Sequence, residues 1–505
     1  MGSQGQAATS GPGDADDDIG RRTHAAAHFV FVPLMAQGHL IPAVDTALLL
    51  ATHGAVCTIA GTRATAARVR PTVDSARQSG LTVWLVEFPL DYAEAGLPEG
   101  VDNVDNVPVE HMRSYLDAVA LLRSPIESYL RAHAPYPTCV VSDFCHPWTT
   151  VLASNLGVPR LSFFSMCAFC LLCQHNVERF NAYEGVADDN EPVVVPGLEK
   201  TFLVTRAQAP GCFFRGSPAW EEFADYTERA QAEADGVIMN TFEEMEPEYV
   251  AGYAAAKKMK IWTVGPVSLY HQLGDGATLA ARGNATAIDA DECLRWLDGK
   301  EPDSVVYVSF GSIARADAKQ AMELGLGLEA SGHPFVWVLR NAHEYDEAVR
   351  SFLDELEARV AGRGLLIRGW APQVLILSHV AVGGFVTHCG WNSTLEAVAA
   401  GLPVVTWPHF SDQFLNQKMA VEVLDIGVSV GVTEPLMYRK EVKEIGVGRG
   451  VVEEAVRSVM GGGVEAEERR RRARALAAKA RAAVQEGGSS HGNLLDLASR
   501  FRAAS

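Results

Sequence analysis

The stretch "HCGWNSTLEAVAAGLP", residues 388–403, decides the fold because it begins where an expected strand ends and contains the helix expected after that strand. The run "VGGFVTH", residues 382–388, is largely apolar and β-branched, which predicts a buried strand that ends at His388. Gly390 is expected at the turn and Asn392 to Ala400 in a helix, ended by Gly401 and followed by Pro403. The N-terminus of this helix therefore faces the carboxyl end of a strand, where open α/β sheets bind their ligands.

The polar residues at the start of this helix predict an anion site. Free backbone N–H groups and the helix dipole favour a group such as pyrophosphate there. His388, Asn392 and Ser393 would add donors around it. One alternative stays open: Ser393 and Glu396 have the S-x-x-E spacing of a capping box, in which Ser393 would only cap the helix.

The rest of the chain predicts two domains. From His28 onward, short β-branched runs alternate with longer helical patterns, which indicates parallel sheets with helices on both faces. The pattern stops in a polar stretch near residues 251–290 and then begins again, so we predict an α/β protein of two Rossmann-like domains. The expected parts are a disordered tail at 1–27, a first domain at 28–256, a linker and second domain at 257–484, and a C-terminal helix at 485–505 that packs back on the first domain.

Composition narrows the class of partner. The chain has 505 residues and a formal net charge of −19, which argues against a nucleic-acid groove or an anionic membrane surface as the main partner. Nine cysteines are an odd number, thinly spread, and no run approaches the roughly 18 apolar residues of a membrane span. We therefore expect a reduced, cytoplasmic monomer that binds small molecules.

A candidate catalytic pair lies in the first half. The first strand leads into "MAQGHLIP", where Pro42 is expected in the first helical turn and His39 in the preceding turn. The positive end of the helix dipole should lower the pKa of His39 and keep it neutral as a proton acceptor. The strand "TCVVSD" brings Asp143 to the same sheet edge, where its carboxylate would orient the imidazole and stabilise its cation. His146 is the alternative base.

The segment from Trp370 to Gln413 resembles, almost position for position, the signature box of plant secondary-metabolite UDP-glycosyltransferases. It carries W-A-P-Q, H-C-G-W-N-S, a Glu and D-Q at the spacing of that family. The resemblance covers nearly everything after residue 27. Outside the box it rests on "VPLMAQGHLIP", "GLPEGVDNVD", "NTFEEMEPEYV", "WTVGPV", "YVSFGS" and "GGSS".

The resemblance implies a GT-B fold whose two domains face each other across a cleft, with the sugar donor bound mainly by the second domain and the acceptor by the first. A flat indole suits a pyrimidine, and a carboxylate suits two neighbouring hydroxyls. Gln413 at the end of the box is typical of relatives that prefer UDP-glucose. The implied donor residues are Trp370 and Ala371 for uracil, Gln373 and Glu396 for ribose, Ser312, His388, Asn392 and Ser393 for the diphosphate, and Trp391, Asp412 and Gln413 for the sugar.

The resemblance also implies the reaction. His39 would take the proton of an acceptor hydroxyl while its oxygen attacks the anomeric carbon and UDP leaves from the opposite face, which inverts the stereochemistry. The predicted activity is O-glucosylation of a flavonoid, another phenolic or a terpenoid, with UDP-glucose as co-substrate and no metal or other cofactor. Aromatic residues that suggest an apolar acceptor are Phe144, Trp148, Phe163, Phe164, Phe169, Phe213 and Phe214.

The sequence disfavours two other functions and two possible metal sites. A nicotinamide-dependent dehydrogenase would need a G-x-G-x-x-G turn, which "PLMAQGHLIP" lacks. A non-catalytic metabolite carrier of the same fold is disfavoured because both His39 and Asp143 are present. Cys167, Cys170 and Cys173 are expected to be buried thiols, and the "DAD" of residues 289–291 to supply helix N-terminal charge, rather than to bind metal.

Overall fold

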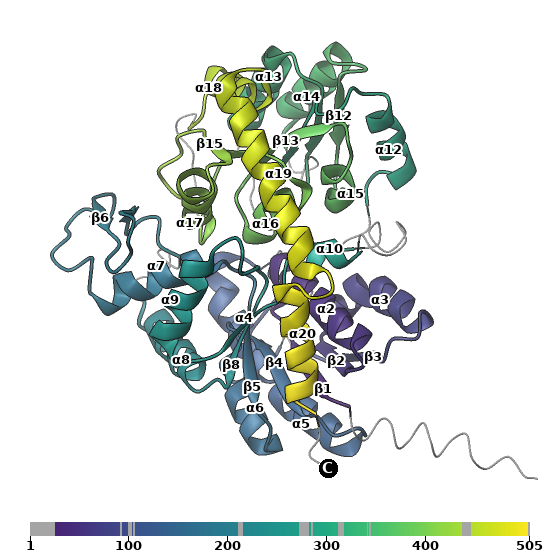
Figure 1. Ribbon diagram of the computed structural model, residues 1–505, viewed down its shortest axis with the longest axis vertical. Helices are drawn as coiled ribbons and strands as arrows, with labels where there is room; N and C mark the ends of the chain where they lie inside the picture. Colours follow the sequence, from purple (N-terminus) through teal and green to yellow (C-terminus); the bar gives the residue numbers. More distant parts are fainter. Residues whose placement is uncertain are drawn as a thin grey trace, which may run out of the picture.

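The computed structural model describes residues 26–90, 93–98, 104, 107–210, 216–271, 282–283, 286–311, 318–340, 342, 345–436 and 446–502. They form two α/β domains, one above the other in Figure 1. The first contains a seven-stranded parallel sheet with Rossmann-like strand order. Its strands, in spatial order, are β3 (Val83–Glu87), β2 (Val56–Gly61), β1 (His28–Val32), β4 (Cys139–Asp143), β5 (Arg160–Phe164), β8 (Gly236–Met239) and β9 (Ile261–Thr263).

The second domain contains a six-stranded parallel sheet. The two parallel sheets confirm the predicted α/β fold. Because β9 pairs with β8, the first sheet continues beyond residue 256, where the sequence pattern placed the end of the first domain. The strands of the second sheet, in spatial order, are β12 (Gly364–Ile367), β11 (Phe335–Val338), β10 (Val305–Ser309), β13 (Val382–Thr387), β14 (Val404–Thr406) and β15 (Gly427–Ser429).

The helices that connect these strands include two whose N-termini matter most for the site, α2 (Gln37–Thr52) and α16 (Trp391–Ala400). A short antiparallel hairpin, β6 (Pro192–Val194) with β7 (Leu203–Thr205), extends from the first domain. The other helices are α3 (Arg63–Gln78), α4 (Met112–Ala120), α5 (Arg123–Ala132), α6 (Thr149–Leu156), α7 (Ala168–Arg179), α8 (Pro218–Ala232), α9 (Pro247–Lys257), α10 (Val267–His271), α12 (Ala290–Asp298), α13 (Ala318–Ser331), α14 (Glu347–Arg359), α15 (Gln373–Leu377), α17 (Gln413–Lys418), α18 (Arg449–Met460), α19 (Val464–Val484) and α20 (Ser489–Arg500).

Helix α2 begins earlier than the sequence pattern predicted. Its N-cap is Ala36, so Pro42 is the sixth helical residue rather than a residue of the first turn. The expectation was wrong because proline is favoured in the first turn but is also tolerated deeper in a helix when another group takes the orphaned carbonyl. His39 is consequently the third residue of the helix, not part of the turn before it.

Helix α16 has the predicted end and begins one residue before the predicted start. Gly401 at its C-cap has a φ of 78°, a left-handed conformation that glycine adopts without strain. The capping-box alternative is wrong. The N-cap is Gly390, which offers no side-chain cap, and Ser393 is the third residue inside the helix. The polar side chains at this N-terminus therefore have contacts other than capping.

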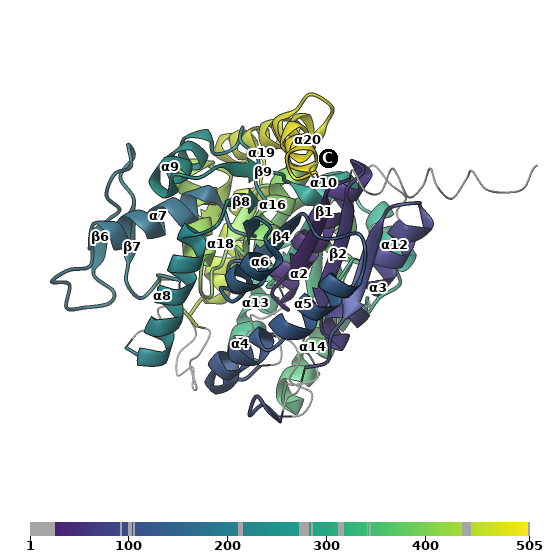
Figure 2. The same ribbon diagram turned by 90° about the horizontal axis from the view of Figure 1, so that it is seen from below.

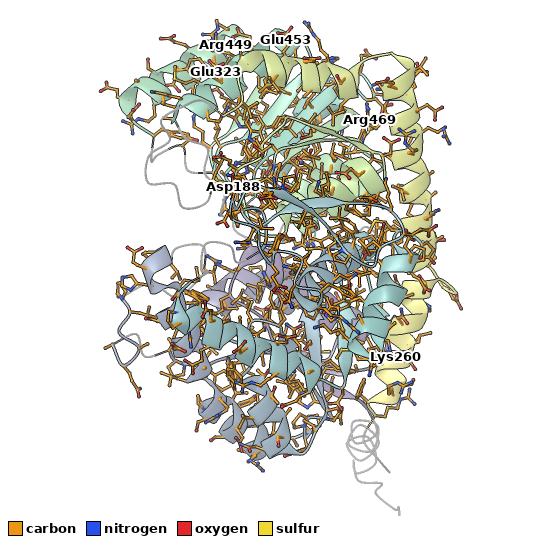
Figure 3. All side chains as sticks on the ribbon, turned by 90° about the vertical axis from the view of Figure 1, so that its left-hand side faces the viewer. Asp188, Lys260, Glu323, Arg449, Glu453 and Arg469 are labelled. Atoms are coloured by element: carbon orange, nitrogen blue, oxygen red, sulfur yellow. The ribbon has the colours of Figure 1, made fainter. Side chains whose placement is uncertain are left out.

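The last two helices connect the domains. In Figure 1, α19 descends along the second domain and α20 continues along the first. Helix α19 packs on α16, whereas α20 packs on α2 and β9. Figure 2, seen from the side of the first domain, shows α19 and α20 beside β9 and α4 and α5 on the opposite side. Asp496 of α20 accepts hydrogen bonds from Trp262 Nε1 at 2.7 Å and Lys260 Nζ at 2.5 Å, and Figure 3 shows Lys260 beside this helix.

The interior is continuous across the domain interface. One apolar cluster extends from Phe169 of α7 to Trp391 of α16. Cys167, Cys170 and Cys173 are buried in this cluster, as predicted. Asp289 caps α12 by accepting the N–H of Glu292 at 3.1 Å, which accords with the expected helix-terminal role. Among the helices that the structure describes, none has both the length and the apolarity needed to cross a bilayer.

Candidate active site

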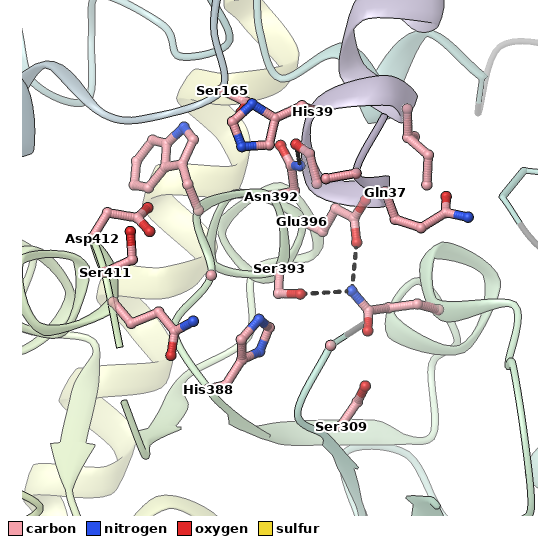
Figure 4. A pocket seen from close by; sticks show the side chains of 18 of the residues that line it. Gln37, His39, Ser165, Ser309, His388, Asn392, Ser393, Glu396, Ser411 and Asp412 are labelled. Atoms are coloured by element: carbon pink, nitrogen blue, oxygen red, sulfur yellow. Dashed lines mark hydrogen bonds between the residues drawn. The ribbon is translucent and has the colours of Figure 1, made fainter. Parts of the chain in front are cut away.

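A cavity of about 280 Å³ lies between the carboxyl ends of the two sheets and is lined by both domains (Figure 4). The first domain contributes the loop after β1 and the start of α2, including His39. The second contributes segments that follow β10, β11, β12, β13 and β14. Ser312 lies outside the described residues, although Ser309 and Gly311 line the same cavity. The predicted donor residues that line it are Trp370, Ala371, Gln373, His388, Trp391, Asn392, Ser393, Glu396, Asp412 and Gln413.

His39 and Asp143 form a hydrogen-bonded pair at the edge of the first sheet. Strands β1 and β4 are neighbours, so the residues that follow them come together. His39 Nδ1 lies 2.7 Å from Asp143 Oδ2, and Asp143 Oδ1 accepts the N–H of Cys145 at 2.9 Å. A carboxylate can only accept, so Nδ1 carries the proton and Nε2 is the ring nitrogen that can accept another. The His39 side chain is 24% exposed, whereas that of Asp143 is completely buried.

The electrostatics of His39 differ from the expectation. Burial alone would lower its pKa, but the carboxylates of Asp143 and Asp412 outweigh burial and raise the pKa above its ordinary value. The predicted lowering by the helix dipole was therefore wrong, because the adjacent Asp143 carboxylate, with a smaller contribution from Asp412 of the other domain, favours the protonated imidazole. Burial would raise the pKa of Asp143, yet the neighbouring His39 lowers it overall. The result is an ionised Asp143 beside an imidazole that is more basic than usual.

The alternative base, His146, is completely buried. Its Nε2 lies 3.3 Å from the carbonyl oxygen of Pro33, and it is not among the residues that line the cavity. Burial lowers its pKa. Its placement therefore favours a structural role.

His388 lies at the N-terminus of α16 between two glycines. A Cβ on Gly311 would come within 2.5 Å of the His388 ring, and one on Gly390 within 2.4 Å. Gly311 also has a φ of 74°, so both the space and the backbone favour glycine there. Burial, together with His409, lowers the pKa of His388 to about 3. His388 is therefore neutral at physiological pH and brings no positive charge to the cavity, and its ring also bonds to the Ser309 backbone.

Gln373 and Glu396 form a polar cluster beside Ser393. Gln373 Nε2 donates to Glu396 Oε2 at 2.8 Å and to Ser393 Oγ at 3.0 Å (Figure 4). The Tyr307 hydroxyl donates to Gln373 Oε1 at 3.3 Å. Glu396 Oε1 accepts from Arg282 at 2.5 Å. These bonds hold a buried carboxylate at the cavity wall, where it can accept from neighbouring hydroxyls of a ligand.

Two of the predicted donor side chains bond to the first domain. Asn392 donates its amide N–H to the carbonyl of Gly38, which is available because Pro42, four residues on, has no N–H to offer it. Asn240 donates to Asn392 Oδ1 at 3.2 Å, and Trp391 Nε1 donates to the Asn240 carbonyl at 2.7 Å. These side chains therefore tie the start of α16 to α2 and to the residue that follows β8.

The two residues at the end of the signature box are also held in place. Gln413 Oε1 accepts the N–H groups of His409 at 2.8 Å and Phe410 at 3.2 Å. Asp412 Oδ2 accepts from Asn416 Nδ2 at 2.7 Å, and burial raises the pKa of Asp412. Figure 4 shows Asp412 and His39 on the same side of the cavity. A negative group at this position can accept hydrogen bonds from ligand hydroxyls and also raises the pKa of His39.

The apolar wall of the cavity differs from the predicted aromatic set. Among the described members of that set, Phe144 alone lines the cavity. Trp148, Phe163, Phe164 and Phe169 are buried in the core, and Phe213 and Phe214 lie outside the described residues. Other apolar residues of the first domain line the cavity, namely Leu34, Ile41, Val104 and Met166.

Sequence reasoning missed two arginines of the cavity. The Arg340 guanidinium lies 5.0 Å from the centroid of the Trp370 ring system. It follows β11 at the carboxyl edge of the sheet, so the rule that located His388 could have found it. Arg282 lies in the stretch between the domains, where no periodic pattern or motif marks it.

Two facing Rossmann-like domains, with a His–Asp pair on one and a nucleotide-type helix N-terminus on the other, define a GT-B glycosyltransferase that uses a nucleotide-activated sugar. The family model for UDP-glucoronosyl and UDP-glucosyl transferases matches residues 290–443, and that for the glycosyltransferase N-terminal domain matches residues 26–269. The chain belongs to the UDP-glycosyltransferase family, which confirms the enzyme class predicted from the signature box.

Comparisons with individual proteins support the same family assignment. The chain is 45% identical over 472 residues to UDP-glycosyltransferase 73C5 of Arabidopsis thaliana, covering 92% of this chain and 95% of that protein. The crystal structure of Glycyrrhiza uralensis UGT73P12 with glycyrrhetinic acid 3-O-monoglucuronide matches with a TM-score of 0.86 at 34% identity, covering 94% and 96% of the two chains. Phytolacca americana UGT2 with UDP-2fluoro-glucose and pterostilbene matches at 0.72 and 27% identity, covering 94% and 100%.

Proposed function

We propose that this protein transfers glucose from UDP-glucose to a hydroxyl group of a small apolar plant metabolite, with inversion at the anomeric carbon. The observation that carries the proposal is His39, which lines the same cavity as the ten described donor residues and is hydrogen-bonded to Asp143 behind it. A base on one domain thereby faces the residues that the family uses for its donor on the other. Gln413 at the end of the signature box supports glucose as the sugar.

The reaction follows from the positions of these groups. His39 Nε2 accepts the proton of the acceptor hydroxyl as its oxygen bonds to the anomeric carbon, and the bond from that carbon to UDP breaks with its electron pair on UDP. Asp143 stabilises the imidazolium that forms. A base of this kind contributes roughly 10²- to 10⁴-fold to the rate. Backbone N–H groups at the start of α16 and the neutral His388 stabilise the charge on the departing diphosphate.

In this proposal Trp370 stacks on uracil, Ala371 bonds its edge through the backbone, and Gln373 and Glu396 bind the ribose. Ser312, His388, Asn392 and Ser393 surround the diphosphate, with Asn392 acting mainly through its backbone because its side chain bonds to Gly38. Trp391, Asp412 and Gln413 lie at the sugar, and Trp391 also acts through its backbone because its indole N–H bonds to Asn240. No metal enters the reaction.

The acceptor class is proposed from the cavity wall and the relatives. Phe144, Ile41 and Met166 give the first-domain side an apolar surface near His39. The glycyrrhetinic acid glucuronide and pterostilbene complexes of the matched structures support hydroxylated terpenoid and phenolic acceptors for this chain. We also propose that the protein is a cytoplasmic monomer, which its eight described, unpaired cysteines and its net charge of −19 support.

The test is to mix the full chain with UDP-glucose and a panel of phenolic and terpenoid alcohols, and to follow UDP release and product mass. A hexose should be added to at least one acceptor, and proton NMR should show a β-linked anomeric centre. EDTA should leave the rate unchanged, and light scattering should give a mass near 54.4 kDa. Acceptor binding without UDP release from any pairing would instead identify a non-catalytic carrier, and an α-linked product would refute inversion.

A further inference from the structure

Arg282 bridges the two domains at the cavity. Its Nε lies 2.9 Å from Asp45 Oδ2 and its second terminal nitrogen 2.8 Å from the same oxygen, while the other terminal nitrogen lies 2.5 Å from Glu396 Oε1. Asp45 belongs to α2, the helix that carries His39, and Glu396 belongs to α16. One side chain from the stretch between the domains therefore joins the catalytic helix to the donor helix.

All three charged groups are removed from solvent. The exposed fractions of the Arg282, Asp45 and Glu396 side chains are 10%, 2% and 8%. Surface ion pairs contribute little, but removing one partner of a buried network leaves an uncompensated charge with no water to solvate it. Arginine suits this position because its planar guanidinium presents N–H donors in a fixed fork, so two of its nitrogens bond to Asp45 while the third bonds to Glu396.

The network fixes the carboxylate without using all of its acceptor capacity. Arg282 bonds to Glu396 Oε1 and Gln373 bonds to Oε2, each by one hydrogen bond. An ionised carboxylate has about four acceptor sites, so two vicinal hydroxyls can still bond to it. The backbone next to Arg282 also packs closely against Trp370. A Cβ at Gly283, whose φ is 91°, would come within 2.4 Å of the Trp370 indole.

We propose that Arg282 is a positioning residue for the sugar donor. By anchoring on Asp45, it holds the Glu396 carboxylate oriented toward the ribose hydroxyls of the nucleotide. The proposal rests on the proposed function, which places the ribose at Glu396. The Glu396 carboxylate of the second domain is thus oriented by Arg282, which is itself anchored on Asp45 of the first domain. Affinity for the sugar donor therefore depends on a contact with the first domain.

The experiment measures binding of UDP and of 2′,3′-dideoxy-UDP, which lacks both ribose hydroxyls, by titration calorimetry on the full chain. In Arg282→Gln, UDP affinity should fall about tenfold or more, the effect of losing a hydrogen bond to a charged group. Affinity for the dideoxy nucleotide should stay within about twofold of wild type, because that ligand cannot use Glu396. The KM for UDP-glucose should rise in parallel, with kcat changed much less.

Arg359→Gln is the matched control, because Arg359 forms a two-point pair with Glu329 on the surface at 2.8 and 2.9 Å. It should bind both nucleotides as wild type does. If Arg282→Gln does not fold by circular dichroism, Asp45→Asn tests the same anchor with little change in volume, and it should weaken UDP selectively as well.

Equal losses for UDP and the dideoxy nucleotide, or no loss for either, would overturn the role of Arg282. Those results would leave the proposed function intact, since wild type would still bind UDP and transfer glucose. Failure of the wild-type protein to bind UDP at all would instead refute the proposed function. The two failures are therefore distinguishable in one set of titrations.

Discussion

Replacing Asp143 with Asn tests the catalytic pair most directly, because it removes a charge and leaves the shape. The carboxylate is completely buried and lies 2.7 Å from His39 Nδ1. A hydrogen bond to a charged group contributes about 1.5–3 kcal/mol, and the partner charge matters most once the imidazole has taken a proton. Since about 1.4 kcal/mol corresponds to a tenfold change in rate, kcat/KM should fall roughly 10- to 150-fold at a pH where wild-type His39 is neutral.

The pH dependence of the rate shows in which direction Asp143→Asn changes the pKa of His39. In the wild type, Asp143 and Asp412 raise the pKa of His39 above its ordinary value of 6.5 against the opposing effect of burial. The acidic limb of the wild-type profile should therefore lie above that value. Without the Asp143 charge, burial dominates and the limb should move to lower pH. The loss of rate should accordingly be larger at pH 8.5 than at pH 6, where wild-type His39 is already partly protonated.

The assay is UDP release at saturating acceptor between pH 5.5 and 9, with donor affinity measured separately. UDP affinity should stay within a few-fold, because Asp143 lies behind His39 and does not line the cavity. An acidic limb that stays in place, or moves to higher pH, would show that Asp143 does not set the basicity of the catalytic group. A loss of UDP binding equal to the loss of rate would show that the substitution had disturbed the donor site instead.

Three further substitutions test separate parts of the cavity. His39→Ala should lower transfer roughly 10²- to 10⁴-fold while UDP-glucose affinity changes only a few-fold, and a comparable loss of donor binding would remove its assignment as base. Trp370→Ala should weaken UDP binding by about 1–3 kcal/mol, the usual contribution of an aromatic platform under a base, so an unchanged dissociation constant would refute stacking. Gly311→Ala should cost about 1–2 kcal/mol of stability for its left-handed backbone and, with a Cβ placed 2.5 Å from the His388 ring, weaken UDP binding as well. Thermal unfolding with and without UDP separates those two effects, and a variant with wild-type Tm and UDP affinity would contradict both.

The order of elements could be predicted from local pattern. The strand before His388, the helix after Gly390 and its end at Gly401 are each specified by residues within a few positions of one another, and the structure places them within one residue of the prediction. The predicted start of α2 was wrong because proline is usually found in the first helical turn, whereas α2 begins five residues before Pro42. The Gly38 carbonyl, which Pro42 leaves without a helical N–H, accepts a hydrogen bond from Asn392 of the other domain.

Contacts between the domains could not be predicted in this way. The raised pKa of His39 depends partly on Asp412, 373 residues further along the chain, and local sequence around His39 contains no sign of it. Arg282 lies in a stretch with no periodicity, so its partners Asp45 and Glu396 become evident only when both sheets are in place. The hydrogen bond from the Trp391 indole N–H to the Asn240 carbonyl also joins the two domains and could not be predicted from local sequence. An indole N–H at the start of a helix could equally have faced a ligand.

The return of α20 to the first sheet makes the first domain discontinuous in sequence. Phe501 packs against Phe29 and Trp262 with ring centroids 5.9 and 6.0 Å apart, and Leu494 and Leu497 belong to the same buried cluster. A first domain produced from residues 26–271 alone would expose this apolar surface to water. A self-sufficient version would need residues 489–502 grafted onto it or supplied as a separate peptide. Chimaeras that exchange the second domain between relatives should keep this final helix with its original first domain.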